Sequence, residues 1–126
     1  MVRCHAFEKH NSLLDNIMAY SESVALRVRQ VLGRRHDIVD KKMFGGVGFL
    51  LNGNMCVGIW KNSLIVRIDP ESYEDALKEE CVRKFDITGR PMKGWILVEP
   101  DGIESDDQLR KWIEQSLDFV VTLPNK

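Results

Sequence analysis

Three short apolar runs, separated by turn residues, form the middle of the chain. They cover Met43–Leu51, Met55–Trp60 and Leu64–Ile68, with Asn52-Gly53 in the first gap and Lys61-Asn62-Ser63 in the second. Asn-Gly between apolar runs is the strongest short-range hairpin signal, because both residues tolerate positive φ. The pattern therefore predicts three antiparallel strands in a meander.

The two-residue period of a strand assigns side chains to the two faces of this predicted sheet. Two further strands are expected, a short one over residues 85–87 and another over residues 95–99, which read WILVE. In the middle run of the meander, one face should carry Met55, Val57 and Ile59, and the other Cys56, Gly58 and Trp60.

Helical spacing of apolar residues follows clear start signals in two segments. Residues 21–32 place apolar side chains on one helical face, and Gly33 follows as a stop. Near the C-terminus, Ser105 and Gln108 match a capping box, and an apolar face then continues as far as Val121. Both segments are predicted to be amphipathic helices.

A third helix is predicted after Asp69-Pro70. Asp can cap a helix, and Pro suits the first turn because its missing N–H is not needed there. Its expected apolar face consists of Tyr73, Ala76, Leu77 and Cys81.

The resulting order, α-β-β-β-α-β-β-α, predicts an α+β fold in two layers, with helices on one face of an antiparallel sheet. A length of 126 residues fits one domain with its own hydrophobic core. We expect that domain over residues 18–126, after an irregular N-terminal extension over residues 1–17. The first helix either begins after Ser21 or continues backwards into the extension, and Met18 is an alternative native start.

Composition and charge limit the classes of function. A net charge of −1 lacks the positive excess of most nucleic-acid-binding proteins, so direct nucleic-acid binding is not expected. No apolar run approaches the roughly 20 residues that span a membrane, and the N-terminus lacks the apolar core of a secretory signal. Cys4, Cys56 and Cys81 are widely spaced and odd in number, which favours a cytoplasmic location and small buried thiols at the last two.

Residues suited to catalysis form no recognisable group. The three histidines lack metal-binding spacing, and no nucleophile motif is present. Gly45, Gly46 and Gly48 look like a phosphate loop, but strand residues follow them, so a bulge or a close backbone approach is expected instead. The sequence therefore predicts a non-enzymatic protein with no catalytic residue, cofactor or metal.

Two basic clusters remain as binding candidates. If they converge in the fold, they would form a positive patch for an anion or an acidic partner; otherwise they form a solvated surface. The predicted binding residues are Arg34 and Arg35 from the first cluster, and Arg90 and Lys93 from the second. The clusters also contain Lys41, Lys42, Arg83 and Lys84.

The second cluster lies around TGRPMKGW, residues 88–95. Gly89 and Gly94 suit bends with positive φ, and Pro91 stiffens the segment between them. Trp95 is expected to begin a strand and to anchor it in the core. Only the two charges of this segment, on Arg90 and Lys93, are not required by a turn.

Three stretches resemble the N-terminal domain of the TfoX/Sxy family: KMFGGVGFLLNGNMCVGI, LIVRIDPESYEDAL and FDITGRPMKGWILVEPDGI. The similarity runs in order over about residues 19–126 and implies a compact two-layer α+β domain. Full-length members are described as regulators of natural competence that act with the cAMP receptor protein, not as enzymes. The structural signature comprises Gly45, Gly46, Gly48, Gly89, Pro91, Gly94 and Trp95.

The resemblance implies a regulatory or protein-interaction module whose partner belongs to the transcription machinery, such as the cAMP receptor protein. A homodimer is a further option. Full-length members continue into a helical C-terminal domain, so we expect a stand-alone N-terminal domain here. Two alternatives stay open: nucleic-acid binding through the basic clusters, and a small-ligand or anion site near Gly45–Gly48 and Arg90–Trp95.

Overall fold

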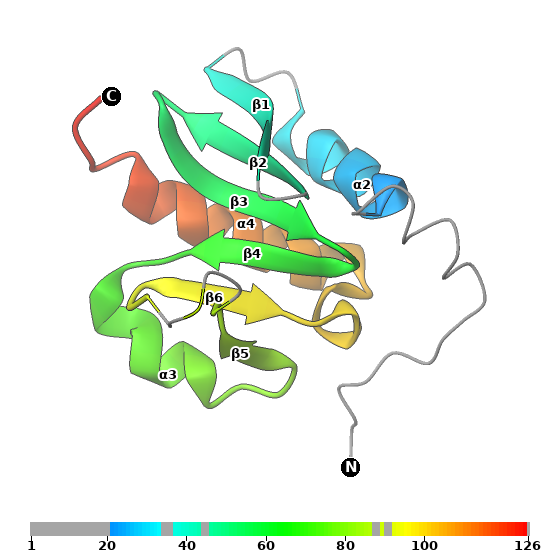
Figure 1. Cartoon of the computed structure of the whole chain (residues 1–126), viewed down its shortest axis with the longest axis vertical. Coiled ribbons are helices and arrows are strands. Elements are labelled where there is room, and N and C mark those ends of the chain that lie inside the picture. Colours follow the sequence, from blue (N-terminus) through cyan, green and yellow to red (C-terminus); the bar gives the residue numbers. More distant parts are fainter. Residues whose placement is uncertain (1–20, 34–36, 44–45, 87–88, 90–91, 126) are drawn as a thin grey trace.

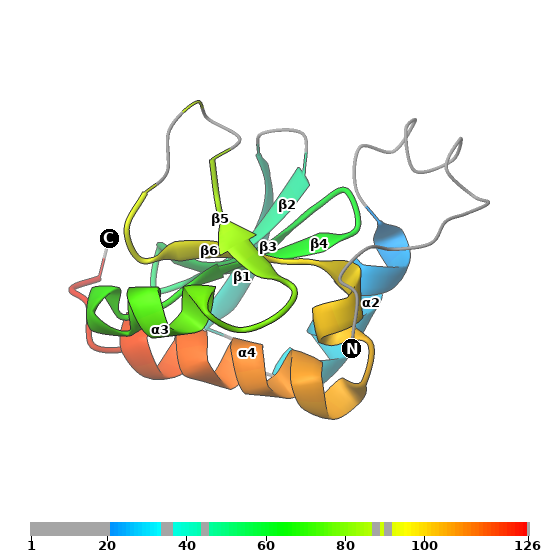
Figure 2. The same ribbon diagram turned by 90° about the horizontal axis from the view of Figure 1, so that it is seen from below.

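A twisted antiparallel sheet and a layer of helices make up the protein (Figure 1). The computed structural model describes residues 21–33, 37–43, 46–86, 89 and 92–125. Figure 2 shows the helices together on one side of the sheet, while the other side carries none of the labelled helices. The predicted α+β class and its two layers are confirmed.

All neighbouring strands of the six-stranded sheet are antiparallel, in the order β1-β2-β3-β4-β6-β5. The first four strands form a meander, and β6 lies between β4 and the edge strand β5. The strands are β1 (Ile38–Met43), β2 (Gly46–Leu51), β3 (Asn54–Trp60), β4 (Ser63–Arg67), β5 (Val82–Lys84) and β6 (Trp95–Val98).

Three α-helices occur in the described chain: α2 (Glu22–Leu32), α3 (Tyr73–Leu77) and α4 (Asp106–Val120). Helix α4 packs against β3 and β4, α2 packs beside α4, and α3 contacts β5 and β6. Short 3-10 turns at Pro70–Ser72 and Pro100–Ile103 precede α3 and α4. No described helix is long and apolar enough to span a membrane.

The predicted starts of the first and last helices are confirmed by their caps, whereas α4 ends at Val120 and Val121, expected on its apolar face, is exposed instead. The Ser21 hydroxyl accepts a hydrogen bond from the Val24 N–H at 3.3 Å, and Gly33 ends α2 with φ +66°. At α4, the Gln108 N–H donates to the Ser105 hydroxyl at 3.1 Å, and the Gln108 side chain accepts from the Ser105 N–H at 2.9 Å. These bonds satisfy backbone donors that a helix start leaves unpaired.

The helix after Asp69 is shorter than predicted. The Asp69 carboxylate does accept from the Glu71 N–H at 2.9 Å, but it caps a 3-10 turn, and α3 ends at Leu77. Tyr73 is buried, and this burial raises the pKa of its phenol above the ordinary value, with the neighbouring Glu74 carboxylate adding to the rise.

Cys81 was expected on that helix and lies beyond it instead. Its backbone has a left-handed φ of +70°, and its side chain is buried. Its sulfur is disulfide-bonded, so the expectation of a small buried thiol is wrong for Cys81. The expectation holds for Cys56, which is buried and not part of a disulfide.

Strand β1 adds an element that the apolar pattern does not predict. Half of its residues, Asp40, Lys41 and Lys42, are charged and exposed, because the strand lies at the sheet edge. Charged edges of this kind oppose pairing with other chains. The predicted strand beginning at Met43 is therefore divided: Met43 ends β1, and Gly46 begins β2.

Strand β5 occupies residues 82–84 rather than the predicted 85–87. Phe85 follows the strand and is 1% exposed, so its apolar character reflects burial rather than strand pairing. Ile87 lies outside the described residues.

The predicted hairpin turns have the expected backbone. Asn52 and Gly53 both have positive φ, at +54° and +85°, which confirms the Asn-Gly turn between β2 and β3. In the next turn, Lys61 has φ +56°, and its carbonyl accepts the Ser21 N–H at 2.7 Å. This bond joins the sheet to the start of α2.

A bulge in β3 changes the predicted faces of that strand. Phe49 pairs with Val57, but Leu50 pairs with Met55, so Cys56 is an extra residue. An extra residue reverses the alternation beyond it. Val57 and Ile59 both face the helices. Cys56 packs against Val120 of α4 and so lies on the same side, while Met55 lies on the opposite side with Trp60. The prediction that Met55 shares a face with Val57, and Cys56 with Trp60, is therefore wrong.

Ser116 of α4 binds this bulge from the helix layer. Its fully buried hydroxyl donates to the Cys56 carbonyl at 2.8 Å. We expect Ser116→Ala to lower the free energy of unfolding by about 1–2 kcal/mol, because a buried carbonyl loses this bond. Chemical denaturation measures the change. Ser72→Ala, whose side chain caps nothing, should change stability by less than about 0.5 kcal/mol; equal losses would contradict the assignment.

Candidate functional site

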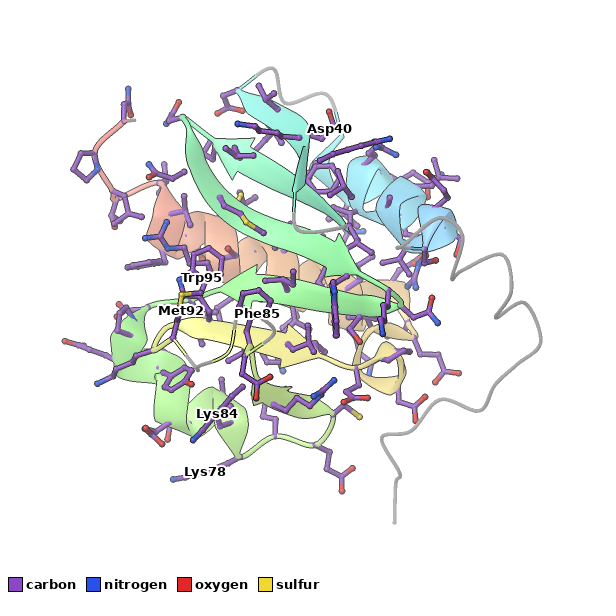
Figure 3. All side chains as sticks on the ribbon, viewed as in Figure 1. Asp40, Lys78, Lys84, Phe85, Met92 and Trp95 are labelled. Atoms are coloured by element: carbon purple, nitrogen blue, oxygen red, sulfur yellow. The ribbon has the colours of Figure 1, made fainter. Side chains whose placement is uncertain are left out.

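The face of the sheet opposite the helices carries a cluster of apolar side chains. Its fully buried members are Ile65, Phe85 and Leu97, and its partly buried members are Met55, Trp60, Met92 and Trp95. We call these seven residues the outer cluster. Figure 3 looks onto this face, where Phe85, Met92 and Trp95 lie together over β6.

One row of paired residues shows how the strands build this face. Residues directly opposite one another in antiparallel strands point to the same side. The row begins at Lys41 on one edge, crosses two adjacent glycines, and reaches the outer cluster before ending at the other edge. Its members are Lys41, Gly48, Gly58, Ile65, Leu97 and Arg83.

The two glycines in the row leave space that a neighbour partly fills. A β-carbon on Gly58 would lie 2.6 Å from the Met55 methyl group and 2.9 Å from the Val47 carbonyl oxygen. Met55 therefore lies where a side chain of residue 58 would be. The bulge makes this arrangement, because it turns Met55 to the outer face.

The connection between β5 and β6 holds Met92 over this face. Its backbone turns at two glycines, Gly89 with φ +107° and Gly94 with φ +93°. The Trp95 N–H donates to the Met92 carbonyl at 3.0 Å, and the Ile68 N–H donates to the Gly94 carbonyl at 2.8 Å. A β-carbon on Gly94 would lie 3.2 Å from the Ile68 carbonyl oxygen, so glycine serves both the φ angle and the close approach.

Cations lie on the tryptophan rings of the outer cluster. The Arg67 guanidinium carbon is 5.1 Å from the Trp95 ring centroid and 5.9 Å from that of Phe119 on α4. The Lys61 ammonium is 4.9 Å from the Trp60 ring centroid. Such contacts hold a cation against an aromatic face. Trp95 begins β6 as predicted, but its half-buried ring belongs to the outer cluster and not to the core under the helices.

Positive charge exceeds negative charge around this cluster. Arg83 pairs with Glu99, which neutralises both. Within the described part of the chain, Lys41, Lys61, Arg67 and Lys93 form no ion pair with a carboxylate. The outer face therefore offers cations that are available to an incoming anion.

Of the four predicted binding residues, only Lys93 can be placed. It is exposed and follows Met92 of the outer cluster. Arg34, Arg35 and Arg90 lie outside the described residues, as do Gly45 and Pro91 of the structural signature. Their predicted roles stay predictions.

Sequence reasoning missed Arg67, Lys61 and Trp60 as members of this surface. Arg67 and Trp95 are direct partners across β4 and β6, although they are far apart in the chain. A usable signal was the alternation LIVRI, in which an arginine occupies a strand position that shares a face with Ile65. Assigning that face to the helix-free side required the complete sheet.

Gly46 has a structural role in the glycine-rich segment. A β-carbon there would lie only 2.0 Å from the Ile59 carbonyl oxygen. The backbones of β2 and β3 thus approach each other where a side chain cannot fit. The expectation of a close backbone approach is met at this glycine.

Two cavities elsewhere are less suited to binding. One of about 230 Å³ lies between α2 and β1, and Arg29 at its wall already pairs with Asp40 at 2.8 Å. The other, of about 210 Å³, has an acidic wall in which Glu79 pairs with Lys111 at 2.9 Å. No group of His, Cys, Asp and Glu in the described residues could hold a metal ion.

Comparison with protein families matches residues 30–120 to the TfoX N-terminal domain. The match extends from the last turn of α2 through all six strands to the end of α4. It therefore contains the whole outer cluster, Arg67 and Lys61. No curated protein matches the chain.

Proposed function

Since the chain belongs to the TfoX N-terminal domain family, we propose that it is a regulatory module that binds a protein partner through the outer cluster. The predicted partner belongs to the transcription machinery, with the cAMP receptor protein as the first candidate. This follows from the family, whose full-length members are described as acting with that protein. Such a role would place the protein in the cytoplasm.

The observation that carries the proposal is the composition of the helix-free face. Tryptophan, methionine and arginine are enriched at protein interfaces, and here Trp60, Trp95, Met55 and Met92 are partly exposed beside Arg67. Methionine adapts its shape to a partner, while the tryptophan rings are held by the sheet. The surface therefore combines tryptophan rings in fixed positions with methionine side chains that can change conformation to fit a partner.

Binding through this surface requires no chemical step by the protein. The six-stranded sheet holds the cluster, and the helices bury the other face of the sheet in the core. A partner that covers the cluster would be joined to this domain without rearranging the core. The module would thus act by recruiting or positioning the partner.

Substitution of the outer cluster tests the proposal. We expect the double variant Trp60→Ala with Met92→Ala to lose binding to the purified cAMP receptor protein, and to lose activation of a competence promoter in a reporter strain. Removal of two interface anchors should reduce affinity by at least about tenfold. Biolayer interferometry with the full chain measures the affinity.

A matched control comes from the helix layer, where Leu26 and Val121 are 54% and 57% exposed. Leu26→Ala with Val121→Ala removes a similar apolar surface and should leave binding and promoter activation unchanged. Circular dichroism confirms that both double variants are folded. Full binding and full promoter activity in the folded outer-cluster variant would refute the proposal.

A further inference from the structure

We propose that the partner segment bound at the outer cluster is an extended peptide with an apolar centre and a carboxylate near each end. Arg67 would bind one carboxylate and Lys61 the other. This inference rests on the proposed function and adds the chemistry of the partner.

Arg67 is held in place but its charge is not neutralised. Its guanidinium carbon lies 5.1 Å from the ring centroid of Trp95 on the sheet and 5.9 Å from that of Phe119 on α4. Within the described residues it has no hydrogen bond and no ion pair to a carboxylate. A ring offers no acceptor to the planar fork of guanidinium N–H donors, and a carboxylate can accept two of these donors at once.

Lys61 provides a second cation at the far end of the same strand. It lies in the turn before β4, whereas Arg67 is the last residue of β4. Six residues of extended chain at roughly 3.3 Å each span about 20 Å. A peptide running along β4 with acidic residues six positions apart would reach both cations, and an even spacing keeps its two acids on one face.

The surface between these cations is apolar. Ile65, at the middle of β4, belongs to the outer cluster together with Met55, Met92 and Trp95. The intervening positions of the peptide that share the face of its acids should therefore be apolar. Carboxylates are favoured at the ends because Arg67 and Lys61 form no ion pair with a carboxylate of the described residues, whereas Arg83 at the sheet edge is already paired with Glu99.

The same geometry disfavours single-stranded nucleic acid. Nucleobases bind such sheets by stacking on bare aromatic faces. Here Lys61 lies over the Trp60 ring and Arg67 over the Trp95 ring, so both rings already have a cation on a face. The net charge of −1 also gives little of the long-range attraction that phosphate binding uses.

A designed peptide tests the inference. The probe is the capped, fluorescently labelled nonapeptide Gly-Asp-Ser-Leu-Ser-Phe-Ser-Asp-Gly, in which both acids and both apolar residues share one face when extended. The reference probe has Asn in place of both Asp. We expect fluorescence anisotropy to show binding of the acidic probe to the full chain, at least about tenfold tighter than binding of the Asn probe.

Variants of the protein assign the two ends. Arg67→Gln should weaken binding of the acidic probe about tenfold, and Arg67→Lys should recover part of the loss because it restores charge without the planar fork. Lys61→Gln should weaken binding about threefold, as expected for a more exposed pair. Arg110→Gln, at an exposed position of α4, removes a charge from the helix layer and should change nothing.

Several outcomes would overturn the inference. These are equal binding of the Asn probe, no binding of the acidic probe at the highest soluble protein concentration, or an unchanged affinity in a folded Arg67→Gln variant. Tighter binding of an oligothymidine that depends on Arg67 would assign the surface to nucleic acid instead. The two proposals can fail separately. If the Arg67→Gln variant still binds the cAMP receptor protein and the double variant of Trp60 and Met92 does not, the proposed function stands. Only the inference that the partner segment carries carboxylates is then refuted.

Discussion

Gly46→Ala is expected to lower the free energy of unfolding by about 3 kcal/mol, at the upper end of the usual range for overpacking. The added β-carbon would lie 2.0 Å from the Ile59 carbonyl oxygen and 3.2 Å from its carbonyl carbon. Both atoms belong to the backbone of β3, which is paired on its two sides with β2 and β4. The neighbour cannot move aside as a flexible side chain would, so the two strands must separate.

Gly89→Ala is the matched control for this prediction. Gly89 has φ +107°, and no atom of the described residues lies within 4 Å of an added β-carbon, so the substitution introduces backbone strain without a clash. Its expected effect is about 1–2 kcal/mol. Urea denaturation of the two variants measures the difference. A loss for Gly46→Ala no larger than that for Gly89→Ala would show that β2 and β3 are not in such close contact.

Trp112→Ala is expected to lower the free energy of unfolding by about 3–5 kcal/mol, the usual range for truncating a buried aromatic residue. Trp112 lies on the apolar face of α4, is 3% exposed, and packs in the core between the sheet and the helices. Its removal would leave a cavity that the sheet and α4 cannot both close. The thermal midpoint and the urea midpoint should therefore fall together.

Trp60→Ala provides the comparison for Trp112→Ala. Trp60 is only half-buried, and its contacts are on the helix-free face. Its truncation should destabilise the protein by less than half as much, at roughly 1 kcal/mol. An equal loss for the two tryptophans would show that the outer cluster is a second core, and it would weaken the argument that this face is kept open for a partner.

The candidate binding surface was only partly accessible to sequence reasoning. Lys93 was selected because a turn does not need its charge, and it does lie beside Met92 of the outer cluster. Arg67 was not selected, because a single arginine inside LIVRI is typical of an exposed strand position. Its importance depends on Trp95 and Phe119, which approach it only after β6 pairs with β4 and α4 packs below.

Local sequence alone determined the Asn52-Gly53 hairpin, the cap at Ser21 and the capping box at Ser105. Each depends on φ preferences or hydrogen bonds between residues within a few positions of one another. The apolar periods likewise determined the α+β class and the two layers. Burial of an amphipathic face requires a second layer, whatever the connections between elements.

Only the tertiary structure decided where β1 lies, which way Met55 points and which cations meet the tryptophans. A charged edge strand has no apolar period, so β1 becomes a strand through its pairing with β2. The bulge at Cys56 arises from the register between β2 and β3, with Ser116 bound to it from α4. These features depend on contacts between distant segments, which one stretch of sequence cannot encode by itself.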